Sequence, residues 1–305
     1  MSTISYRPDI QGLRAVAVLA VVLFHFNPAL LPGGFVGVDV FLVISGFLIF
    51  SILLGRKAQP NYGWFSTLRY FYGSRFRRIA PAYFAMLVVA SLLAAVLLLP
   101  QDLATYMQSL DKAAWFASNT YFAGYGDYFA PASHEKPLLH TWPLAVEIQF
   151  YLLAPFLVLL IPARALKWVL GALLVGLTAL AEYRLRILGI GQATYYSLHA
   201  RLPEFFAGGL VALGLHAAPP RGGGWLGALG LALVLTAAAA QPQLGHFPVL
   251  PMLLPVAGGA DSASADPRLG PAPAVQPPHG LAGRTVVLAL SVALACIGPF
   301  ALLHG

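Results

Sequence analysis

Cysteine and charge are both scarce in this sequence. Cys296 is the only cysteine among 305 residues, which excludes an internal disulfide and a cluster of thiolate metal ligands. Only 10% of the residues are charged, whereas 59% are apolar, and the mean hydropathy is +0.76. Soluble domains of this length do not have such a composition. We therefore expect an integral membrane protein of the all-α class, a polytopic bundle of about nine to ten transmembrane helices.

The apolar segments follow one another along the chain. The first has no small-residue cleavage pattern, so we expect it to remain as a span rather than to be removed as a signal peptide. Stretches long and apolar enough to cross a bilayer are predicted over residues 13–31, 37–54, 79–99, 140–162, 168–187, 203–217, 223–240, 247–260 and 284–303.

The basic residues are unevenly divided between the two sides of these spans. If the N-terminus is cytoplasmic, thirteen of the 18 Lys and Arg residues lie on the cytoplasmic side. The positive-inside rule favours this orientation over its inverse. The rule also explains the net charge of +7, so we expect no nucleic-acid partner.

Two segments are too polar to span. Residues 101–139 carry Leu103, Met107, Leu110 and Ala114 at helical spacing, with aromatic residues near the end, which predicts an interfacial amphipathic helix and an aromatic loop on the outer side. Residues 257–283 are rich in Ala, Gly and Pro and are interpreted as a flexible linker. The predicted organisation is a membrane domain over 1–256, the linker, and a C-terminal transmembrane segment over 284–305.

Arg14 and His25 stand in the first predicted span, where both are costly to place in hydrocarbon. They are 11 residues apart, so a helix places them on one face, about 16 Å apart along its axis. With Arg14 at the inner boundary, His25 is expected near the midplane and facing a cavity. A neutral imidazole there suits a general base, and an arginine at the inner mouth suits a phosphate-bearing donor. The alternatives are that Arg14 anchors the topology and that His25 is a structural hydrogen-bond partner.

Asp39 begins the second predicted span, after Gly33, Gly34 and Gly37, which permit a tight turn. In a hairpin it could approach His25 and orient or charge the imidazole. It could equally be an acidic residue that favours a helix N-terminus.

Arg75 and Arg78 precede the third predicted span. Being three apart, they share a face if the helix begins early enough, and they could then bind one anion. A topology anchor is the alternative.

Two further pairs combine opposite chemistries. His140 and Glu147 are seven residues apart, so two helical turns would place them on one face, about 10 Å apart. Glu147 lies within an apolar segment, where a carboxylate needs a partner or a proton. Arg201 and Glu204 are three apart at the start of the sixth span, a spacing that predicts a structural ion pair within one helix.

Taken in order, five stretches resemble the acyltransferase 3 family of bacterial membrane O-acyltransferases. They read "YRPDIQGLRAVAVLAVVLFHF", "PGGFVGVDVFLVISGFLI", "SRFRRIAPAYF", "HTWPLAVEIQFYLL" and "RLPEFFAGGLVA", and they cover roughly residues 6–217.

The resemblance implies a ten-helix domain in the bacterial inner membrane. Such a domain takes an acyl group, usually acetyl, from cytoplasmic acyl-CoA and delivers it to a hydroxyl of a surface glycan such as a polysaccharide, a lipopolysaccharide or a lipid-linked sugar. The family's arginine and histidine pair falls on Arg14 and His25, its Arg-x-x-Arg motif on Arg75 and Arg78, and its acidic position on Glu147. Acyl-CoA is then a substrate, and no permanently bound cofactor or metal is expected.

The chain departs from the family pattern in three ways. Pro143 and Ile148 replace a serine and a second acidic residue, a late Ser-Tyr-x-x-Tyr-Leu-x-His-x-Pro motif is absent, and no SGNH hydrolase-like domain follows. Two alternatives stay open beside the enzyme. The polar residues could line the path of a glycan or lipid transporter or exporter, or the chain could be a truncated, inactive family member.

Overall fold

The computed structural model describes residues 8–124, 136–217 and residue 236. Within these residues every regular element is a helix, which confirms the all-α prediction. The elements are α1 (Pro8–Phe26), η1 (Gly34–Val36), α2 (Gly37–Lys57), α3 (Trp64–Leu97), α4 (Pro100–Ala114), α5 (Ser118–Phe122), η3 (Leu139–Thr141), α6 (Trp142–Leu160), α7 (Ala163–Arg186), α8 (Gly191–Tyr195) and α9 (Leu198–Ala217).

The helices form two compact units. One contains the described residues up to Tyr62 and those from Gln149 onward, and the other runs from Gly63 to Ile148. The boundary falls within α6.

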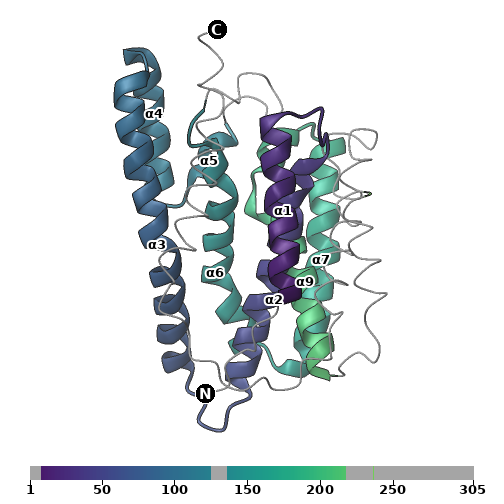
Figure 1. Cartoon of the computed structure of the whole chain (residues 1–305). Helices are drawn as coiled ribbons and strands as arrows, with labels where there is room; N and C mark the ends of the chain where they lie inside the picture. The colour runs from purple at the N-terminus through teal and green to yellow at the C-terminus, as the bar shows by residue number, and fades with distance from the viewer. Residues whose placement is uncertain (1–7, 125–135, 218–235, 237–305) are drawn as a thin grey trace. The chain divides into compact units, whose positions relative to one another are not determined.

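In the first unit, α2 packs against both α1 and α9, and α9 also packs against α7 (Figure 1). Val43 of α2, Ala207 of α9 and Leu174 of α7 form one apolar cluster. Farther along, the Phe150 ring stacks on Phe205 with centroids 3.9 Å apart, and Phe50 lies 6.2 Å from Phe150. These contacts explain why the apolar run of α2 is buried on almost all sides.

Glycines allow α2 and α9 to approach closely. A Cβ added at Gly46 would collide with the Phe205 carbonyl, and one added at Gly208 would collide with the Val43 carbonyl. Small residues at a crossing permit this backbone approach in membrane helices, where packing rather than the hydrophobic effect drives association.

The first helix ends earlier than the sequence pattern predicts. The span was expected over 13–31, but α1 ends at Phe26, directly before Asn27 and Pro28. A proline disfavours helical geometry at the residue before it and lacks a backbone donor, and the Asn27 side chain accepts a hydrogen bond from the Ala29 amide at 3.0 Å instead. His25 therefore lies in the last turn of α1, not in the middle of a helix.

In the second unit, α3 begins 15 residues before the predicted start of the third span. The expected cytoplasmic loop up to residue 78 is helical from Trp64 onward. The Tyr83 hydroxyl of α3 donates to the Ala113 carbonyl of α4 at 2.8 Å, and Ser91 and Tyr106 share a hydrogen bond of 2.9 Å.

The amphipathic segment after α3 folds as two helices, α4 and α5, and α4 is the longer of them. Tyr106, Ser109 and Ala113 are the buried residues of α4, whereas Met107 is 54% exposed. The Tyr106 hydroxyl bonds to Ser91 of α3, so the face of α4 that packs on α3 is partly polar and differs from the apolar stripe.

Four stretches of the described residues are long and apolar enough to cross a membrane: Gly34–Lys57, Trp64–Leu97, Leu139–Leu160 and Ala163–Arg186. Ile10–Phe26 is a shorter apolar helix. The sixth predicted span, 203–217, corresponds to α9, which begins five residues earlier. The predicted spans at 223–240, 247–260 and 284–303 and the linker at 257–283 lie outside the described residues, apart from residue 236.

Candidate active site

Arg14 and His25 both belong to α1, which runs unbroken through them, so the helical geometry that places them on one face applies. Both are half-buried. The Arg14 guanidinium lies over the ring of Phe41 on α2, 5.0 Å from its centroid. This contact holds the arginine against the helix that α1 packs on.

A hydrogen bond determines the tautomer of His25. Its Nδ1 lies 2.8 Å from the Val21 carbonyl oxygen, one turn earlier in α1. A carbonyl oxygen can only accept, so Nδ1 carries the hydrogen and, in the neutral ring, Nε2 carries the lone pair. The ring is thus held with its basic nitrogen directed away from its own helix backbone.

Asp39 lies in the first turn of α2 and is 4% exposed. The sequence suggested either an approach to His25 or a favourable charge at a helix start. In the structure its ion pair is with Arg201 of α9, at 2.9 Å from Oδ1 to Nη1.

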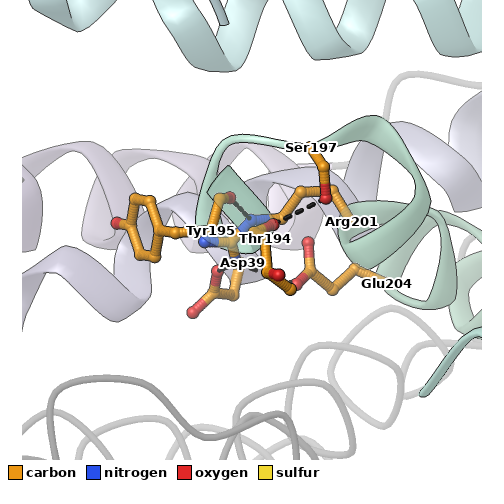
Figure 2. Close-up of polar contacts among 6 residues, drawn as sticks. All are labelled: Asp39, Thr194, Tyr195, Ser197, Arg201 and Glu204. Carbon is orange, nitrogen blue, oxygen red and sulfur yellow. Dashed lines mark hydrogen bonds and ion pairs between the residues drawn. The ribbon is translucent and has the colours of Figure 1, made fainter. Parts of the chain in front are cut away.

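Arg201 is the centre of this buried cluster (Figure 2). Its Nη1 also contacts Oε1 of Glu204 at 3.2 Å, and its Nε donates to the Tyr195 carbonyl at 2.9 Å. The guanidinium lies 4.4 Å from the centroid of the Tyr195 ring. The expected Arg201–Glu204 pair within one helix is confirmed.

Sequence reasoning missed the partner on the other helix. Asp39 and Arg201 are 162 positions apart, so no spacing rule links them. The available signal was that each polar residue begins an apolar helix, where a charge without a partner would be costly.

Arg75 and Arg78 both lie within α3, so the expected shared face is present. Arg75 is half-buried, with its guanidinium 5.7 Å from the Phe71 ring centroid, and Arg78 is exposed.

His140 and Glu147 are arranged differently from the prediction. His140 lies in the 3₁₀ turn η3, before α6 begins at Trp142, so the two-turn spacing of a single α-helix does not describe the pair. Glu147 is in α6 and is 6% exposed.

The predicted residues divide between the two units. Arg14, His25 and Asp39 belong to the first, and Arg75, Arg78, His140 and Glu147 belong to the second. Over residues 8–124 and 136–217, no group of three or more His, Cys, Asp or Glu side chains is arranged to hold a metal ion.

The chain is similar to known membrane acyltransferases. It is 35% identical over 213 residues to the peptidoglycan O-acetyltransferase OatA of Listeria monocytogenes, a match that covers 67% of this chain and 33% of that protein. A protein named as an O-acetyltransferase from Staphylococcus aureus strain MSSA476 is 34% identical, with 68% and 34% covered. BcsY of Komagataeibacter xylinus, named as a membrane-bound transacylase, is 36% identical over 206 residues, with 67% and 50% covered.

These matches span a third to a half of the relatives' own lengths. No solved structure matches the chain at a significant level. The model of one family, described as an acyltransferase domain, matches residues 7–302, beyond the last of the five motifs. The chain belongs to the acyltransferase 3 family and is a multi-pass membrane protein.

Proposed function

We propose that the protein transfers an acetyl group from cytoplasmic acetyl-CoA to a hydroxyl of a cell-envelope glycan, with His25 as the catalytic residue. The observation that carries this is the bond from His25 Nδ1 to the Val21 carbonyl. It keeps the neutral ring in the tautomer whose Nε2 can accept a proton or attack a carbonyl.

Two routes use this nitrogen. As a general base, Nε2 takes the proton of the acceptor hydroxyl while the hydroxyl oxygen attacks the thioester carbonyl. The carbon–sulfur bond then breaks, and the proton passes to the departing CoA thiolate. As a nucleophile, Nε2 attacks the thioester carbonyl, and the carbon–sulfur bond breaks to release CoA as its thiolate. The acceptor oxygen then takes the acetyl group from the ring, the bond from Nε2 to the acetyl carbon breaks, and the hydroxyl proton neutralises the thiolate. Both routes need a neutral imidazole.

The remaining predicted residues have supporting roles. Arg14, Arg75 and Arg78 would bind the phosphates of CoA, for which arginine is well suited. His140 would contact a substrate, and Glu147 would act as an acidic group in the reaction. Asp39 was a candidate to orient or charge the His25 imidazole; its ion pair with Arg201 supports a different role.

The acceptor is a glycan of the envelope. The name of the Listeria relative favours a peptidoglycan sugar as the acceptor. The name of the Komagataeibacter relative describes a membrane-bound transacylase and mentions no acceptor. The basic inner loops support a cytoplasmic N-terminus in the inner membrane.

The test uses His25→Asn. The asparagine amide can still donate to the Val21 carbonyl but offers no basic nitrogen. Purified protein in nanodiscs is given radiolabelled acetyl-CoA and peptidoglycan or polysaccharide fragments. We expect the wild type to release CoA only with an acceptor, and His25→Asn to lose at least 100-fold in rate, as removal of a base predicts. His199→Asn, a matched change on α9, should retain activity. Transfer by His25→Asn at the wild-type rate would refute the assignment.

A further inference from the structure

The Asp39–Arg201 pair joins two helices that are far apart in sequence. Both side chains are almost fully buried, with 6% of Asp39 and 1% of Arg201 exposed. Arg201 is also held by the Tyr195 carbonyl and by Glu204, so these two contacts fix the guanidinium independently of α2. The ion pair with Asp39 connects this fixed guanidinium to α2 (Figure 2).

Asp39 is the third residue of α2, directly after the turn that connects α1 to α2. At the start of α2, Gly37 lies so close to α1 that an added Cβ would collide with the Ala17 carbonyl and lie 2.9 Å from Val21 Cγ2. The first turn of α2 therefore packs on Val21, and anything that holds this turn in place also holds Val21.

Val21 is the residue whose carbonyl accepts the His25 hydrogen bond. The preceding turn η1 makes a second contact, because Gly34 packs against Ala20 and Phe24, and the Phe35 ring lies 5.4 Å from that of Phe24. The Phe24 ring in turn meets the His25 imidazole edge to face at 5.1 Å. Two contacts thus connect the start of α2 to the imidazole.

We propose that the Asp39–Arg201 ion pair is a positioning device for His25. It fixes the first turn of α2 and η1 against the end of α1, so that Nε2 of His25 is held where the reaction occurs. This inference rests on the proposed function of His25. It assigns Asp39 and Arg201 as positioning residues rather than as groups that touch the substrate.

Glu204 provides an internal comparison. It contacts Arg201 from three positions farther along the same helix, and its buried Oε2 has no hydrogen-bond partner among the described residues. Glu204→Gln keeps an oxygen for Arg201 and does not touch the link between α2 and α9. It should therefore affect His25 less than Asp39→Asn does.

The experiment compares Asp39→Asn with Glu204→Gln and with Asp111→Asn. Asp111 pairs with Lys112 on the surface of α4, where its side chain is 58% exposed, so the third variant makes the same chemical change at an exposed site. Acetyl transfer and hydrogen exchange of the backbone amides over residues 27–38 are measured on the full chain in nanodiscs.

We expect Asp39→Asn to lower kcat by about 10- to 100-fold, the size of effect that a small misplacement of a catalytic group produces. The KM for acetyl-CoA should stay near its wild-type value, and exchange over residues 27–38 should become faster. Glu204→Gln should show smaller changes and Asp111→Asn none. An unchanged kcat in Asp39→Asn would overturn the proposal, as would a lost kcat with unchanged exchange.

If Asp39→Asn does not accumulate in the membrane, Arg201→Lys replaces it. Lysine keeps the charge but cannot reproduce the fork that reaches both Asp39 and the Tyr195 carbonyl. We then expect an intermediate loss of kcat with intermediate exchange, and wild-type values of both would contradict the role. His25→Asn separates this inference from the proposed function: it should lose activity while exchange over residues 27–38 stays normal.

Discussion

At the scale of single residues, Arg201 has an unusual environment for a full positive charge, because only 1% of its surface is exposed. It contacts two carboxylates, a backbone carbonyl and an aromatic face. A buried guanidinium is tolerated only when its donors are satisfied in this way.

Arg201→Met is expected to be strongly destabilising. The change leaves Asp39 and Glu204 buried without their cation, and loss of one partner from a buried ion pair costs about 3–5 kcal/mol. Arg186→Met is the matched control: Arg186 pairs with Glu182 within α7, and its side chain is 61% exposed, so about 0–1 kcal/mol is expected. Thermal unfolding of the two purified variants measures the difference. Equal melting temperatures would contradict the structural importance of the cluster.

At the scale of helices, the crossing of α2 and α9 depends on glycines that the apolar pattern did not single out. Gly46→Ala should be destabilising by at least about 1–3 kcal/mol, because the new methyl group meets the Phe205 backbone, which cannot move aside as a flexible side chain can. Gly176→Ala on α7 is the control, since an added Cβ there has no atom within 4 Å. That change should stabilise the helix by about 0.5–1 kcal/mol. A rise in melting temperature for Gly46→Ala would show that the helices do not cross as described.

The sequence predicted the presence of the helices better than it predicted the residues at which they begin and end. The apolar runs at 37–54, 140–162 and 168–187 correspond to α2, α6 and α7 within five residues. The early start of α3 was missed because Arg69, Arg75 and Arg78 interrupt the hydropathy without interrupting the helix. The end of α1 was missed because a hydropathy window ignores Pro28, whose backbone effect is local.

The candidate site was also predicted only in part, because the sequence pattern reports on contacts within a helix and not on contacts between helices. Spacing rules apply within one helix. They predicted the shared face of Arg14 and His25 and that of Arg75 and Arg78. They also predicted the Arg201–Glu204 ion pair. Asp39 and Arg201 meet only through the packing of α2 on α9. A contact between distant positions of this kind cannot be read from periodicity.

At the scale of the whole molecule, the distribution of basic residues makes a prediction about topology. With Cys296 replaced by serine, single cysteines are introduced as Asn61→Cys, between α2 and α3, and Thr120→Cys, in α5; both positions are exposed. A membrane-impermeant maleimide added to intact spheroplasts should label position 120 and should reach position 61 only after lysis. The inverse pattern would reverse the orientation.

We propose that acyl transfer by this membrane protein depends on the lone pair on Nε2 of His25. The most direct measurement is single-turnover transfer of labelled acetyl from acetyl-CoA to glycan by the wild type and by His25→Asn, each reconstituted at equal amounts in nanodiscs. We expect labelled glycan from the wild type and none above background from the variant, with equal melting temperatures. Labelled glycan formed at the same rate by both proteins would contradict the claim.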